Sequence, residues 1–310
     1  MSKRILIAAI HYPVASGRYI ARAFKRLGHD VRTVGPATGN QIWGMTVDER
    51  HVWTPDYFAA PEGRLLSPMT DWEPDLVVTA DSAFRWVGAP GNPVTFECPH
   101  VVWGVDNHVR DYSLGVKFDH YFLAHHDGPA LPVDDSRDDM TWLPCAYDPE
   151  YFTPSPIPMA EREYDVCMIG VVYQRRAEIL NAMAAAGLKV FAGTGLLYED
   201  YRDAYHNSRI SLCVSAAGDV AQRVFETAAM GCAILTDECA DFERLGLRYG
   251  FHIARFSDTQ YAVNEAVDMC RGKYSQLSHF AETAPEWATP HTWDARAQVV
   301  LDTVFGGGRS

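Results

Sequence analysis

One stretch of the chain constrains the fold more than any other. It starts with the apolar run Ser208–Leu212, and after a short loop it continues from Arg223 as small and apolar residues with a single acidic side chain, Glu226. Gly231 ends that segment, and a second apolar run follows at 232–236. Short apolar runs separated by a helical segment indicate buried parallel strands joined by a helix. In such sheets, ligands bind beyond the carboxyl ends of the strands, where helix N-termini offer free backbone N–H groups.

Glu226 is the candidate ligand-binding residue of this stretch. A carboxylate at the start of an otherwise apolar helix can interact favourably with the helix dipole. It can equally accept hydrogen bonds from both hydroxyls of a ribose, because an ionised carboxylate has two acceptor oxygens. Spacing alone does not choose between the two roles.

The alternation of strands and helices extends over both halves of the chain. In the first half we expect strands at 4–9, 29–34, 75–79, 100–103 and 120–124, with a helix at 19–27. In the second half we expect strands at 164–170, 188–192, 209–214 and 232–236, and helices at 175–187, 199–208, 221–230 and from 256 to about 272. Residues 36–74 are irregular and rich in Pro, Trp and Gly, so we expect loops there.

Prolines 149, 154, 156 and 158 cluster between the two halves. Proline-rich segments act as semi-rigid spacers, so we place a domain boundary there. The sequence therefore predicts domains at 1–150 and 151–290, followed by a C-terminal helix and tail at 291–310.

Composition narrows the class of protein. A chain of 310 residues, 47% of them hydrophobic, is long enough for two cores. Its seven cysteines are odd in number and lack zinc-ligand spacing, which favours free thiols in a reducing cytoplasm. We expect neither a signal peptide nor a membrane span, because no apolar run has the required length. The net charge of −13 opposes a polyanionic partner.

Several motifs resemble the C-terminal half of CgeB-like glycosyltransferases. They lie at 142–150, 164–170, 176–180, 205–210 with 223–231, and 291–296, so the resemblance covers about residues 142–300. It implies an α/β protein of GT-B architecture, with two Rossmann-like domains facing each other across a cleft. It also implies a C-terminal helix, here at 291–304, that crosses back to the N-terminal domain.

The resemblance also implies an activity. We expect a sugar to be transferred from a nucleotide-diphosphate sugar, a UDP-sugar first of all, to a hydroxyl acceptor without a bound metal or other cofactor. The acceptor would be a small molecule, a glycan or a protein. A modified nucleic-acid base is disfavoured by the negative charge. The alternatives are an inactive relative that only binds a nucleotide sugar or glycan, and a sugar-nucleotide epimerase of the same fold.

The expected donor site follows the strand at 164–170. Gly170, Tyr173 and Arg176 lie where that strand turns into a helix, and backbone N–H groups with a guanidinium would favour a diphosphate there. Two solvated surface arginines are the alternative. The resemblance favours Arg176 over Arg175 as the phosphate ligand.

Further donor-site candidates surround Glu226, which by the resemblance holds the ribose. Arg223 either pairs with Glu226 or reaches a phosphate, and Ser215 and Asp219 complete the set. Many retaining relatives carry a second Glu eight positions before the first. Here that position is Gly218, which weakens a direct transfer of the retaining mechanism.

The N-terminal half supplies the catalytic candidates His11, Asp106 and His108. Asp106 or His108 would deprotonate the acceptor hydroxyl, but an Asx turn ending the strand at 100–103 is the alternative for this loop. His11 would contact a sugar or acceptor, and a structural histidine is the alternative. His125 and His126 are adjacent in an extended segment, point opposite ways, and are not expected to share a metal ion.

Overall fold

A computed structural model describes residues 1–11, 14–35, 41–42, 45–46, 72–80, 96–114, 116–272 and 274–306. The chain divides into two compact units: Met1–Pro144 with Trp293–Ser310 is unit 1, and Cys145–Thr292 is unit 2. Each unit contains a parallel sheet with helices, so the predicted α/β class is confirmed. Most of the predicted loop region 36–74 lies outside the described residues. Its described part includes a short antiparallel pair, β3 (Gln41–Ile42) with β4 (Met45–Thr46).

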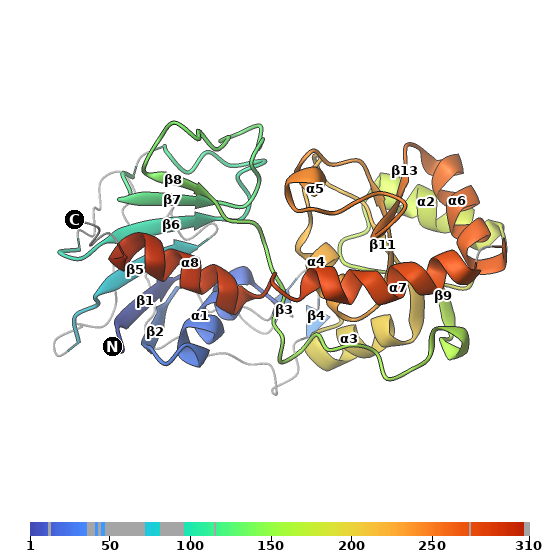
Figure 1. Ribbon diagram of the computed structural model, residues 1–310, viewed down its shortest axis with the longest axis horizontal. Helices are drawn as coiled ribbons and strands as arrows, with labels where there is room; N and C mark the ends of the chain where they lie inside the picture. Colours follow the sequence, from blue (N-terminus) through green and yellow to red (C-terminus); the bar gives the residue numbers. More distant parts are fainter. Residues whose placement is uncertain are drawn as a thin grey trace. The chain divides into compact units, whose positions relative to one another are not determined.

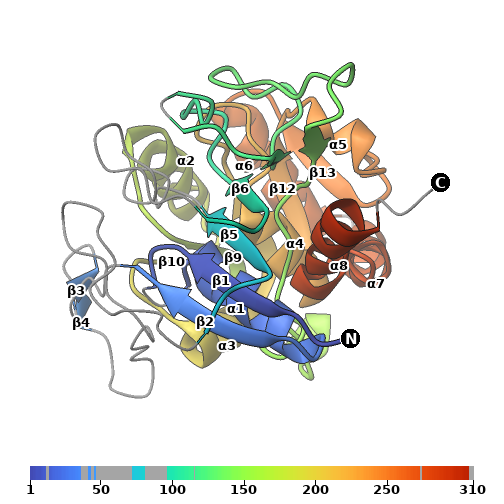
Figure 2. The same cartoon turned by 90° about the vertical axis from the view of Figure 1, so that its left-hand side faces the viewer.

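Unit 1 is built on a parallel sheet of order β2-β1-β5-β6-β7-β8. Figure 2 shows β2, β1, β5 and β6 side by side in this order. The strands are β1 (Arg4–Ala8), β2 (Asp30–Val34), β5 (Leu76–Ala80), β6 (His100–Gly104), β7 (His120–Leu123) and β8 (Met140–Trp142). Every residue of β5 and β7 is buried. Parallel strands have both faces covered, which is why they appear in the sequence as continuous apolar runs.

Two helices far apart in sequence pack together on unit 1. The helix α1 (Ser16–Arg26) contacts α8 (Trp293–Phe305), which runs across this unit in Figure 1. Arg26 binds Asp294 through two hydrogen bonds of 2.8 and 3.0 Å, and Trp293 stacks on Tyr19. The C-terminal helix therefore returns to the first unit, as predicted.

Unit 2 has a parallel sheet of order β10-β9-β11-β12-β13. The strands are β9 (Tyr164–Ile169), β10 (Val190–Gly193), β11 (Ser208–Cys213), β12 (Ala233–Asp237) and β13 (Ile253–Phe256). The helices are α2 (Gln174–Ala185), α3 (Tyr198–His206), α4 (Gln222–Ala229), α5 (Asp241–Arg244), α6 (Thr259–Val267) and α7 (Tyr274–Ala288). Short turns lie at Met159–Glu161 and Asp268–Gly272. The helix α7 lies beside α4 (Figure 1).

Besides the short pair β3 and β4, the described strands and α-helices that were not predicted are β8, β13, α5 and α7. Of these last four, β8, β13 and α5 span only three or four residues each, too few to show a period. Pro285 lies inside α7. Because a proline in a sequence normally marks a helix boundary, it argued against a helix here. These elements depend on tertiary packing more than on local pattern.

The proline-rich segment packs on unit 2. Ser155 donates from its backbone N–H to the Met230 carbonyl at 3.1 Å and from its hydroxyl to the His206 carbonyl at 2.9 Å. The division between the units falls after Pro144, six residues before the sequence-based boundary at 150.

Candidate active site

Arg176 lies at the carboxyl edge of the sheet in unit 2, in the first turn of α2. Its guanidinium donates to the carbonyls of Val171 at 2.9 Å and Val214 at 2.6 Å, and it lies over the Tyr173 ring at 4.2 Å. The Tyr173 hydroxyl donates in turn to the Ser215 carbonyl at 2.7 Å. The side chain is therefore fixed between the ends of β9 and β11.

Arg223 reaches the same edge from α4. Its Nη2 donates to the Ile169 carbonyl, the last of β9. A side chain on Gly170 would place its Cβ 2.6 Å from that nitrogen, and Gly170 has a φ of +139°, a conformation that favours glycine. The Gly170 N–H donates to the Gly193 carbonyl at 2.9 Å. This differs from the expectation that its backbone would face a diphosphate: its missing side chain makes room for Arg223.

The two guanidinium groups form a buried cationic pair. Within the described residues, neither has a carboxylate within 4.0 Å, and three buried nitrogens, Nε of Arg176 with Nε and Nη1 of Arg223, have no hydrogen-bond acceptor. Burial lowers the pKa of Arg176, and the charge of Arg223 lowers it further. Unpaired buried donors on charged groups are costly. An anion bound here would satisfy them.

The neighbouring Arg175 is neutralised. It donates to the Asp237 carboxylate at 2.7 Å, and its own side chain is 45% exposed. The same carboxylate accepts from the Ser215 backbone N–H at 2.9 Å and hydroxyl at 2.8 Å. Ser215 is thus held at the end of β11 by Asp237. Arg176, in contrast, has no carboxylate partner among the described residues.

Asp219 stabilises the loop between β11 and α4. Its Oδ1 accepts from the backbone N–H groups of Ala216 at 2.7 Å and Ala217 at 2.9 Å. Gly218, in the same loop, is exposed and has a φ of +77°. The geometry therefore gives Asp219 a role in shaping the loop.

Glu226 is buried in the second turn of α4, beyond the first turn where a helix dipole acts strongly. Its Oε2 accepts from the Tyr201 hydroxyl at 2.8 Å, and its Oε1 accepts from the Gln222 side-chain amide at 2.6 Å. Burial raises its pKa, while these two bonds and the charge of Arg223 oppose the rise. Arg223 makes no ion pair with Glu226 in the described structure, so the pairing alternative for Arg223 is not observed.

In unit 1, the loop after β6 carries Asp106 and His108. The Asp106 carboxylate pairs with Arg110 at 3.2 Å, and its backbone carbonyl accepts from the N–H groups of Val109 and Arg110 at 2.9 Å. The His108 ring packs edge-on against His125 at 4.6 Å, and its Nδ1 is buried without a partner among the described residues. The loop is therefore a turn, and both side chains remain at the carboxyl edge of this sheet.

His11 is only 2% exposed, and its Nε2 lies 3.2 Å from the Val34 carbonyl. This contact fits the structural alternative. His125 is also buried, with its Nε2 3.1 Å from the Val105 carbonyl. His126 lies between Asp127 and Asp135, at 2.8 and 3.1 Å.

Sequence reasoning missed Tyr201, Gln222, Asp237 and Asn107. Asn107 joins three chain segments, because its side chain contacts the His125 backbone N–H and the carbonyls of His125 and Leu131. Asp237 directly follows the predicted strand at 232–236, and that position was a usable signal. No sequence signal pointed to Tyr201 or Gln222, since only the fold brings them to Glu226.

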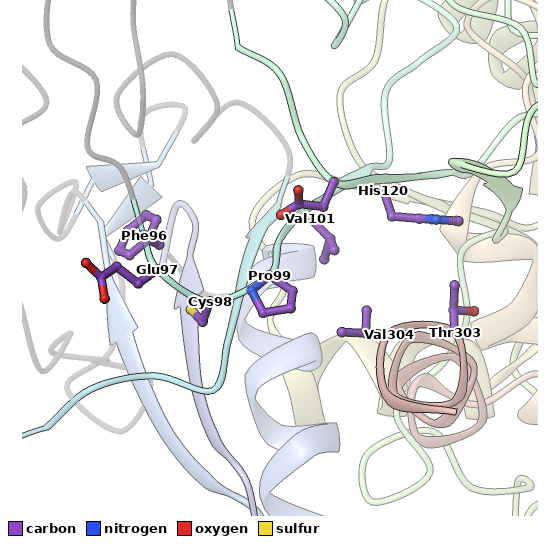
Figure 3. A pocket seen from close by; sticks show the side chains of 9 residues that line it. Phe96, Glu97, Cys98, Pro99, Val101, His120, Thr303 and Val304 are labelled. Atoms are coloured by element: carbon purple, nitrogen blue, oxygen red, sulfur yellow. The ribbon is translucent and has the colours of Figure 1, made fainter. Parts of the chain in front are cut away.

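A cavity lies elsewhere, at the amino ends of β6 and β7. It has a volume of about 490 Å³, and Cys98, His120 and Val304 are among its lining residues (Figure 3). His120 at its edge bonds Thr141, and burial lowers the pKa of that histidine. Ligands of parallel sheets bind at the opposite, carboxyl edge, so we do not place the active site here.

All seven cysteines are free thiols. No group of His, Cys, Asp and Glu side chains with metal-binding geometry occurs among the residues that the structure describes. Over the same residues, no helix is both long enough and apolar enough to cross a membrane.

Comparison with solved structures defines the class: this chain has the GT-B fold of two-domain glycosyltransferases. HepE from Anabaena, solved with UDP and glucose, is 12% identical, with 98% of this chain and 99% of that chain covered and a TM-score of 0.68. Sucrose-phosphate synthase from Thermosynechococcus elongatus is 11% identical, with 97% of each chain covered and a TM-score of 0.64. A glycosyltransferase from Rickettsia africae is 11% identical, with 100% of each chain covered and a TM-score of 0.64.

Sequence comparison is more specific for the second half of the chain. Residues 157–302 match the family described as glycosyl transferase-like. The matched region includes Arg176, Arg223 and Glu226. No curated protein matches the sequence.

Proposed function

We propose that the protein is a CgeB-like glycosyltransferase that moves a sugar from a nucleotide-diphosphate sugar, a UDP-sugar first of all, to a hydroxyl acceptor. The observation that carries the proposal is the buried pair Arg176 and Arg223, with three guanidinium nitrogens lacking acceptors. It lies within the glycosyl transferase-like region, and HepE of the same fold was solved with UDP and glucose.

The arginine pair explains how the donor would be activated. As the bond between the sugar C1 and the diphosphate oxygen breaks, the electron pair stays on the departing diphosphate. Guanidinium groups already in place stabilise that charge without reorganising. We therefore propose that no metal ion is needed, and expect a chelator to leave the rate unchanged. Glu226 would hold the two ribose hydroxyls.

The acceptor side belongs to unit 1 in this proposal. The acceptor oxygen forms the new bond to C1, and its proton passes to Asp106, with His108 as the second candidate base. Such a base contributes about 10²–10⁴ in rate. Direct attack of this kind inverts the configuration at C1.

Incubation with a panel of UDP-, GDP-, ADP- and TDP-sugars tests the function. Transfer to added acceptors, or slow hydrolysis of one donor, would support it. Binding without turnover would indicate a relative that only binds its ligand, and conversion of one nucleotide sugar into another would indicate an epimerase. A thermal-shift screen with the four diphosphates comes first, since a ligand at 100 times its Kd stabilises the fold by about 2.7 kcal/mol.

A further inference from the structure

The two oxygens of Glu226 have different surroundings. The hydrogen bond from Tyr201 to Oε2, 2.8 Å long, is buried. The hydrogen bond from Gln222 to Oε1, 2.6 Å long, is only partly buried. Oε2 therefore has a buried partner, whereas the partner of Oε1 is itself only partly buried.

Tyr201 itself is rigidly held. It projects from α3, and its ring packs against Phe152 at 5.7 Å and Tyr205 at 4.9 Å between centroids. Burial, and then the charge of Glu226, raise the pKa of Tyr201 well above its usual value. The hydroxyl therefore keeps its proton and acts as the donor to the carboxylate.

We propose that Tyr201 is the positioning residue of Glu226: its hydroxyl fixes Oε2, so that Oε1 is the oxygen which Gln222 gives up to an incoming ribose hydroxyl. The proposal rests on the function proposed for Glu226. Tyr201 touches the carboxylate and no part of the reacting groups, so its effect passes through Glu226. The carboxylate would otherwise rotate about its last side-chain bond.

The hydrogen bond from Tyr201 also affects the pKa of Glu226. The groups that face Glu226 are Tyr201 from α3, Gln222 and Arg223 from α4, and Asp148 from the segment before β9. Burial and Asp148 raise the pKa of Glu226, while the other three lower it. Loss of the Tyr201 hydroxyl therefore favours the protonated carboxyl, which accepts hydrogen bonds from a diol less well.

The test compares Tyr201→Phe with a matched control, Tyr205→Phe. Tyr205 lies one turn further along α3 and is also buried, and its hydroxyl accepts from the Ile169 backbone N–H at 3.1 Å instead of reaching Glu226. Carboxyl-carbon NMR of the whole unliganded protein follows the titration of Glu226, with the signal assigned through Glu226→Gln. We expect Tyr201→Phe to raise the midpoint and Tyr205→Phe to leave it in place.

Calorimetry with UDP gives the second readout. We expect Tyr201→Phe to bind UDP about 10-fold more weakly, with the loss shrinking as pH rises and the carboxyl ionises. Binding of dideoxy-UDP, which lacks both ribose hydroxyls, should not change. A purely structural defect would weaken the binding of UDP and of dideoxy-UDP alike. Any loss of affinity in Tyr205→Phe should follow this second pattern.

A second variant distinguishes a change in the hydrogen bond from a folding defect. Replacing Tyr201 with monofluorotyrosine keeps the shape of the ring and makes the hydroxyl a stronger donor, so the Glu226 midpoint should fall. An unchanged midpoint in both Tyr201 variants would overturn the positioning role. A shifted midpoint in a protein that binds no nucleotide would uphold it and overturn the proposed function instead.

Discussion

The carboxyl edges of the two sheets handle charge in opposite ways. In unit 1, Asp106 pairs with Arg110 at 3.2 Å, and His126 lies between two aspartates. In unit 2, Arg176 and Arg223 are buried against backbone carbonyls. In unit 2 Arg175 is paired with Asp237, but Arg176 and Arg223 have no carboxylate partner among the described residues, at a cost to stability. The edge of unit 2 therefore has buried cationic donors that an anion would satisfy, whereas the charges named at the edge of unit 1 already have partners.

The largest expected effect is on turnover through unit 1. Asp106→Asn should lower the single-turnover rate about 10²- to 10⁴-fold while UDP affinity stays near that of the parent protein. Asp111→Asn is the control, because Asp111 lies in the same loop and, within the part of the chain that the structure describes, its carboxylate bonds only to Ser113. Near-normal turnover in Asp106→Asn, or a product that retains the donor configuration, would remove Asp106 as the base and leave His108 or a retaining mechanism.

In unit 2, the loss of UDP affinity on replacing an arginine should depend on whether a carboxylate already pairs with that arginine. Arg176→Ala and Arg223→Ala should each weaken UDP binding roughly 10- to 150-fold, since each removes hydrogen bonds to a charged group. Both should bind the free nucleoside nearly as well as before. Arg175→Ala should change little, because Asp237 already binds Arg175 at 2.7 Å. Calorimetry on the three variants checks this ranking, and equal losses for all three would contradict the comparison.

The ionised carboxylate of Glu226 should lower the stability of the fold at neutral pH and strengthen the binding of UDP. Its pKa is raised in the fold, so its contribution to stability is full below the pKa of the unfolded chain and is lost as pH rises through the folded value. Glu226→Gln should therefore raise the Tm at neutral pH by a few degrees, with little gain near pH 4. The same variant should bind UDP about 10-fold or more weakly. Thermal scans across pH, paired with titrations, measure both; a lower Tm at neutral pH would contradict the sign.

The smallest effect should appear in unit 1, with the opposite sign. Burial lowers the pKa of His100 to about 4 from 6.5, so its stabilising contribution is present above 6.5 and is lost as pH falls towards 4. The protection factors of the amides in β5 and β6, which correct the exchange rates for the intrinsic slowing of exchange at lower pH, should therefore fall over that range. His100→Gln can keep the contact with Thr79 and should reduce this fall in protection. If both proteins show the same profile, His100 is not the group responsible.

Much of the fold could be predicted because parallel strands are continuous apolar runs, as in β5 and β9. The site could be predicted only in part. Gly170 and Asp219 lie where expected, but Gly170 makes room for Arg223 and Asp219 binds its own loop. Tyr201 lies 25 residues from Glu226 in sequence, and only the packing of α3 beside the sheet joins them. Spacing identifies residues near a strand end, whereas hydrogen bonding decides which of them are free to bind.

The return of α8 to unit 1 has a consequence for how the chain is made. Unit 2 is a continuous stretch, whereas unit 1 is completed by residues that follow it. Trp293 lies against Trp103 and Tyr19, so the nascent first unit leaves those aromatic rings uncovered until the whole of unit 2 has been synthesised. Exposed apolar surface of this kind promotes aggregation. Unit 2, although second in the chain, can complete its core first on the ribosome, whereas the core of the first unit is completed only when α8 has been made.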